Sequence, residues 1–179
     1  MFALRFASLF LLSTSLVSAV VVDKRASTAD VETVFNTLKS STDSILPQID
    51  SLVSGGTATD DTVTPLINDL TAALDTATAS LGTLAPAGLK RQSDDDVANL
   101  VAGIITDITN SLNGLLGTAS TIPALGGLLA GVDTSLNQVL IGLETLLAGV
   151  LNLVANLLVD VAGLLRSLAL GLTLATLGL

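Results

Sequence analysis

The fold of this chain is decided by its C-terminal third, residues 124–179, ALGGLLAGVDTSLNQVLIGLETLLAGVLNLVANLLVDVAGLLRSLALGLTLATLGL. Its charged residues are only Asp133, Glu144, Asp160 and Arg166. From residue 125 to residue 157, Leu and Val recur at alternating steps of four and three, which is typical of a helix that packs lengthwise on other helices. The pattern predicts an all-α protein whose C-terminal half is long, helical and very apolar.

The apolar side of this helix widens after residue 146, and the remaining polar residues form a thin line at helical spacing. So broad an apolar arc has to be buried in a protein core, in a bilayer or against another apolar surface. Few aromatics and many glycines predict a loosely packed bundle that can rearrange. We expect an apolar face that binds an external surface, made of Leu146, Leu147, Val150, Leu153, Val154, Leu157, Leu158, Val161, Leu164, Leu165 and Leu168.

The composition removes most catalytic chemistry. The chain has 179 residues, half of them apolar, and contains no Cys, His, Trp or Tyr. It therefore has no thiolate nucleophile, no imidazole base and no zinc site of the ordinary kind. We expect a protein that is not an enzyme, with no catalytic residues, no cofactor and no metal. The formal net charge of −9 argues against nucleic acid as a partner.

The N-terminus is typical of a secretory signal peptide, residues 1–19. Arg5 supplies the positive charge, an apolar run follows, and Val17-Ser18-Ala19 forms a small-residue cleavage site after Ala19. A membrane anchor is the weaker interpretation, because the apolar run is too short to span a bilayer. The dibasic pair Lys24-Arg25 then predicts a short propeptide, residues 20–25, and a mature chain that starts at Ala26.

Residues 26–84 predict an acidic, amphipathic helical hairpin. The first helix opens at Ser27 with capping residues and runs to Ser54, with Pro47 expected to kink it or to end it about a turn early. Gly55-Gly56 supplies the turn, and the second helix begins near Asp60-Asp61. Two such helices joined by a short turn pack antiparallel.

Residues 85–96 predict a linker, and residues 97–179 an apolar helical region. The linker holds a second dibasic pair, Lys90-Arg91, which is either a processing site or ordinary solvated surface. The acidic run that ends the linker, Ser93 to Asp96, predicts the start of a third helix that continues to Leu116. Carboxylate pairs such as Asp94-Asp95 are explained by this capping role, without acid–base catalysis.

The hairpin carries a family resemblance. The motifs VETVFNTL (31–38), IDSL (49–52) and LTAAL (70–74), with the Gly55-Gly56 turn, resemble the fungal hydrophobic surface-binding proteins, which include cell-wall galactomannoproteins. The layout of signal peptide, polar first half, apolar second half and no cysteine is similar to that of the basidiomycete aerial-hypha and attachment proteins that are not hydrophobins.

This resemblance implies a secreted protein of the cell wall or hyphal surface. Such a protein adsorbs to a hydrophobic solid or to the air–water interface and helps hyphae to attach or to grow into air. Self-association and binding to a cell-wall polysaccharide are further implied partners. The chain departs from the surface-binding family in its very apolar tail, residues 146–179, which favours the interfacial role over the recruitment of hydrolases also credited to that family.

The same tail leaves a membrane-associated protein as the alternative. Residues 161–179 are nineteen residues with one charge, Arg166, and nearly long enough to span a bilayer. Arg166 would have to reach a head-group region, which counts against a span. A removable lipid-anchor signal ends in a similar tail, but residues 156–163 form a poor polar spacer for one.

Overall fold

The computed structural model describes residues 27–84 and 94–179. All regular structure in these two ranges is helical, which confirms the all-α prediction. The α-helices are α1 (Thr28–Ser54), α2 (Asp60–Gly82), α3 (Asp94–Leu116), α4 (Leu125–Leu146), α5 (Val150–Leu157), α6 (Ala162–Ser167) and α7 (Gly171–Leu177). Two short 3₁₀ turns, Ala119–Thr121 and Val159–Val161, connect α3 to α4 and α5 to α6.

Local chemistry sets the limits of α1. Ser27 and Asp30 form a capping box: the Asp30 carboxylate accepts a hydrogen bond from the Ser27 N–H at 2.8 Å, and the Asp30 N–H donates to Ser27 Oγ at 3.3 Å. Pro47 does not end the helix early, since α1 continues to Ser54. Ile45, Leu46 and Ile49 are buried on both sides of this proline. Their packing offsets the lost backbone hydrogen bond, which costs roughly 3 kcal/mol.

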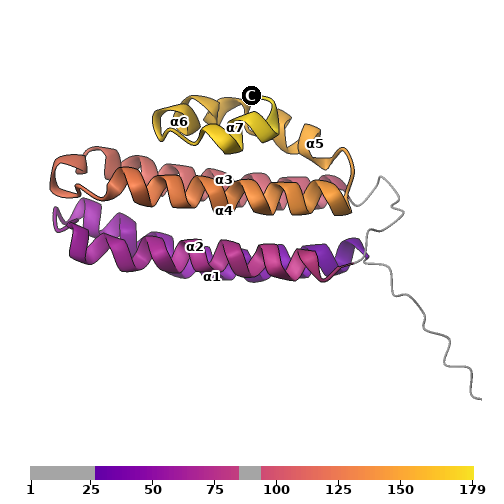
Figure 1. Cartoon of the computed structure of the whole chain (residues 1–179), viewed down its shortest axis with the longest axis horizontal. Coiled ribbons are helices and arrows are strands. Elements are labelled where there is room, and N and C mark those ends of the chain that lie inside the picture. The colour runs from indigo at the N-terminus through magenta and orange to yellow at the C-terminus, as the bar shows by residue number, and fades with distance from the viewer. Residues whose placement is uncertain (1–26, 85–93) are drawn as a thin grey trace, which may run out of the picture.

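The helices form three layers (Figure 1). The antiparallel hairpin of α1 and α2 is the first layer, and α3 and α4 are the second. The close helix pairs between these layers are α1 with α3 and α2 with α4. The third layer consists of α5, α6 and α7, which lie on the far side of α3 and α4. We call this third layer, residues 150–177, the C-terminal cap.

The second layer is buried on two sides. Helix α3 packs on α1 and also on α5 and α6, while α4 packs on α2 and also on α7 and α5. Helices α3 and α4 do not form a close pair with each other, so the cap spans them both. A helix between two layers needs apolar residues over most of its circumference. This position explains why apolar side chains dominate the chain from residue 97 onwards.

The heptad pattern runs from residue 125 to residue 157, but several helices share it, because the chain turns back after α4. Gly149 has φ of +91°, in the left-handed region that only glycine adopts readily. Helix α4, with 22 residues, is already about as long as the 23-residue α2 and α3. A longer α4 would project beyond its neighbours and expose its apolar face, whereas the reversal buries that face on α3 and α4.

Candidate surface-contact site

The cap buries a continuous apolar surface against the second layer, and we call this interface the seam. The cap's buried apolar residues are Val150, Leu151, Val154, Leu158, Ala162, Leu165, Leu168, Leu170, Leu174 and Leu177. Except for Ala162, they belong to the same core cluster as the buried residues of α3 and α4. The seam is therefore one edge of a single core that runs through all three layers.

The residues expected to contact an external surface lie mostly in this core. Leu146, Leu147, Val150, Val154, Leu158, Leu165 and Leu168 are buried, and Leu153, Val161 and Leu164 are half-buried. Only Leu157, at 48%, is exposed. In the folded protein these side chains thus meet other helices, and their contact with an outside phase stays a prediction that requires the cap to move.

A buried carboxylate holds the far part of the cap to α4. Asp133, on α4, is 5% exposed. One of its oxygens accepts from the Leu172 N–H at 2.9 Å, and the other accepts from the Thr173 N–H at 2.9 Å and from Thr173 Oγ at 2.8 Å. These donors form the first turn of α7, whose N–H groups have no partner within the helix. Asp133 therefore caps a helix that lies some forty residues further along the chain.

Two more polar residues of α4 hold the cap. The Glu144 carboxylate accepts from the Gly149 N–H at 2.8 Å and from the Leu151 N–H at 3.3 Å, and so caps α5 next to the turn. Asn137 is hydrogen-bonded to Thr176 of α7. Asp133 and Glu144 stand out in the sequence as charged residues of an apolar segment, but their spacing predicts no role for them. Their isolation in an apolar segment was the available signal, because buried charges need partners.

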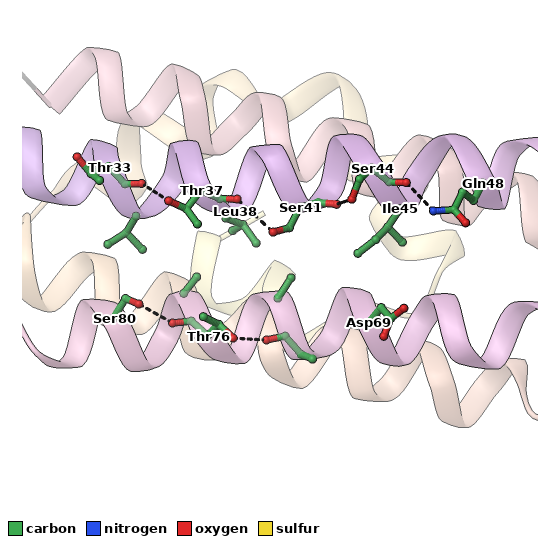
Figure 2. Close-up of a pocket in the computed structure, with 14 residues that line it drawn as sticks. Thr33, Thr37, Leu38, Ser41, Ser44, Ile45, Gln48, Asp69, Thr76 and Ser80 are labelled. Carbon is green, nitrogen blue, oxygen red and sulfur yellow. Dashed lines mark hydrogen bonds between the residues drawn. The ribbon is translucent and has the colours of Figure 1, made fainter.

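The opposite side of the molecule is polar. A groove of about 640 Å³ runs between α1 and α2, and hydroxyl groups line its walls above a floor that includes Leu38 and Ile45 (Figure 2). The hydroxyls donate along their own helices: Thr37 to the Thr33 carbonyl at 2.9 Å, and Ser80 to the Thr76 carbonyl at 2.8 Å. Their oxygens remain able to accept hydrogen bonds from water or from a sugar.

An ion pair joins α1 to α3. Lys39 Nζ donates to Asp43 at 2.9 Å and lies 3.5 Å from Asp107. The hydrogen bond from Lys39 to Asp43 raises the pKa of Lys39 above 10.5, with further help from Asp107 and against the opposing effect of desolvation. A raised pKa means that the pair stabilises the fold below pH 10.5, and that this contribution is lost as the pH rises through the folded-state pKa.

We therefore expect Lys39→Met to lower the free energy of unfolding only slightly, by less than about 1 kcal/mol at pH 7, because all three side chains are largely exposed. Above pH 10.5 the difference from the wild type should shrink. Urea unfolding of both proteins at pH 7 and at a pH above the folded-state pKa of Lys39 measures this difference in the free energy of unfolding. An equal loss at both pH values would show that the packing of the lysine stem matters instead of its charge.

The residues expected to take part in processing all lie outside the described ranges. They are Ala19, Lys24, Arg25, Lys90 and Arg91. Within residues 27–84 and 94–179, no cluster of three or more acidic side chains is placed to hold a metal ion. No single helix there is long and apolar enough to cross a bilayer; Val150–Leu157 taken with Val159–Ser167 meets that criterion as a pair bent by 58°.

The fold and the seam define a small, cysteine-free helical bundle closed by a polar-latched C-terminal cap. No protein-family model matches the chain. A stretch of 61 residues, 34% of the chain, is 56% identical to fruiting body differentiation protein 16 of the basidiomycete Flammulina velutipes. The match spans 48% of that relative, about half of its length. The chain thus has a partial relative whose name refers to the development of fungal fruiting bodies.

Proposed function

We propose that this protein is a secreted, structural, surface-active protein of a fungal cell wall or hyphal surface. It adsorbs to hydrophobic solids or to the air–water interface and helps hyphae to attach or to grow into air. The observation that carries the proposal is the leucine-rich cap of short helices, which packs ten buried apolar side chains against α3 and α4. The fruiting-body name of the relative supports a role in a tissue that grows into air.

The energies are of the right size for adsorption to compete with folding. A helical face tens of Å long offers several hundred Å² of apolar surface, so its burial on an outside phase is worth of order 10 kcal/mol. The stability of a small domain is about 5–15 kcal/mol. A bundle without disulfides can therefore exchange internal apolar contacts for contacts with oil, wax or air.

The test is adsorption of the purified protein to polystyrene and to clean silica, measured by quartz crystal microbalance, with drop tensiometry alongside. We expect a stable layer on polystyrene, little on silica, a lowered surface tension, and a coated plastic that water wets. The last result is expected because the hydroxyl-lined α1–α2 face would point outwards. Equal adsorption to both solids, or to neither, would contradict the proposal.

A membrane-associated protein held by its C-terminal tail is the second candidate. The bent pair that meets the length and hydropathy criterion for a span is the observation that favours it. Flotation with liposomes separates the two candidates. Co-flotation that survives high salt and carbonate would favour the membrane, whereas release of the full-length protein into culture medium without detergent would favour the surface-active role.

A further inference from the structure

The closed surface of the protein offers an outside apolar phase little to bind. Among the described residues the exposed large hydrophobic side chains are Ile141, Leu157, Val159 and Leu172, and each is only about half exposed, at 48–60%. The seam, in contrast, hides ten apolar side chains of the cap together with the faces of α3 and α4 that they cover. Opening the seam exposes enough apolar area to hold the protein on a surface, and it leaves the packing of α1 on α3 and of α2 on α4 in place.

We propose that the seam itself is the contact surface, and that the cap swings away from α3 and α4 when the protein meets an apolar solid. This inference rests on the proposed function and names its site and its partner. The partner is an extended hydrophobic phase, since the seam opens into long helix faces and not into a concave pocket with convergent polar groups. The cap and the second layer would then lie side by side on that phase.

The hinge is the turn between α4 and α5. Residues 147–149 join the cap to α4, and Gly149 has the backbone freedom to change direction there. The Glu144 carboxylate accepts from the Gly149 N–H, in this turn, and from the Leu151 N–H, in the first turn of α5. These two hydrogen bonds can therefore persist at the N-terminus of α5 while α6 and α7 move away from α3 and α4.

The latch lies at the other side of the cap. The three hydrogen bonds that Asp133 accepts from Leu172 and Thr173, and the bond that Thr176 Oγ donates to Asn137 Oδ1, all have to break when α7 leaves α4. They explain why the closed form is stable in water, where an exposed seam would be costly. On an apolar surface the gain from the seam outweighs these few bonds.

The cap is built to detach before the body unfolds. Its helices have only 8, 6 and 7 residues, too short to be stable without tertiary contacts. Ala169, between α6 and α7, has φ of +58°, a left-handed conformation that is unfavourable for alanine. At the end of α4 away from the hinge, an open, mainly apolar surface groove of about 350 Å³ lies between this turn and the α3–α4 connection.

A disulfide that locks the cap tests the proposal, and the absence of native cysteine makes the design unambiguous. Asn137→Cys with Thr176→Cys replaces a hydrogen-bonded pair between α4 and α7 and leaves Asp133 intact. The matched control is Asp75→Cys with Ser135→Cys, which replaces the 2.7 Å hydrogen bond between α2 and α4 and does not touch the cap. Circular dichroism and the reduced form of each protein check that both variants fold.

Adsorption to polystyrene is measured before and after reduction. The oxidised 137–176 variant should adsorb at least about tenfold more slowly than its own reduced form, because adsorption proceeds through the open state. The oxidised 75–135 variant should change less than about twofold, because its cap still opens.

Each outcome decides between the seam and the proposed function. If the wild type and the oxidised 137–176 variant adsorb equally, the seam is not the contact surface, although the protein is still surface-active. If both disulfides block adsorption equally, the whole bundle opens and the cap is not a separate lid. A wild type that fails to adsorb at all would overturn the proposed function, and the role of the seam with it.

Discussion

Asp133→Ala should release the cap more than any other single polar substitution in the described part of the chain. The change removes the acceptor of three hydrogen bonds and leaves the buried Thr173 N–H and the partly buried Leu172 N–H unpaired. A hydrogen bond to a charged group is worth about 1.5–3 kcal/mol. We expect the free energy of cap opening to fall by roughly 3 kcal/mol, which raises the open population about a hundredfold.

Native-state hydrogen exchange measures this effect at individual amides. The α7 amides, Gly171–Leu177, should exchange much faster in the variant, while those of α1 and α2 keep their protection relative to global unfolding. Asp160→Ala is the matched control, because Asp160 is also in the cap and loses the same charge but is exposed. Equal acceleration by both substitutions would show that the loss of charge alone matters. No acceleration by Asp133→Ala would show that the hydrogen bonds of Asp133 do not hold the cap closed.

The limits of the first three helices could be predicted because local chemistry decides them. Ser27 and Asp30 form the capping box at the start of α1, and Gly56, with φ of +65°, turns the chain after it. The acidic run that begins α3 places negative charge at a helix N-terminus, as expected. These signals act over a few residues and need no knowledge of the tertiary structure.

The break after α4 could not be predicted in the same way. The pattern of Leu and Val continues past Gly149 without a change of composition, and the segment contains many other glycines. Gly126, Gly131 and Gly142 lie within α4, whereas Gly149 takes a positive φ. What selects Gly149 is the length of the neighbouring helix, since the chain turns where α2 ceases to cover α4. That length is a property of the bundle and not of any short window.

The destination of the apolar face was open for a related reason. Hydrophobic periodicity shows that a face must be buried, but it does not identify what covers it. Leu158 and Leu165 were assigned to an outside surface, and the folded chain buries both against its own second layer. Only the lone carboxylates Asp133 and Glu144 pointed to an internal partner. A buried charge in an apolar helix requires donors nearby, and here α7 and α5 supply them.

If the cap is a separate cooperative unit, the same truncation should act differently in the two parts of the molecule. Leu70, on α2, and Leu165, on α6, are both completely buried. Leu→Ala at such sites costs about 2–5 kcal/mol. Leu165→Ala should lower the free energy of cap opening by that amount, because the open state has already lost the contacts of Leu165.

Leu70→Ala should lower the free energy of global unfolding by the same 2–5 kcal/mol but leave cap opening unchanged, since its contacts with the body persist when the cap is open. Hydrogen exchange at low denaturant separates the two processes: the cap amides report opening, and the slowest amides of α1–α3 report global unfolding. Reduced protection of the cap in Leu70→Ala, equal to that in Leu165→Ala, would mean that the three layers unfold together. The seam would then have no way to open in a protein that is otherwise folded.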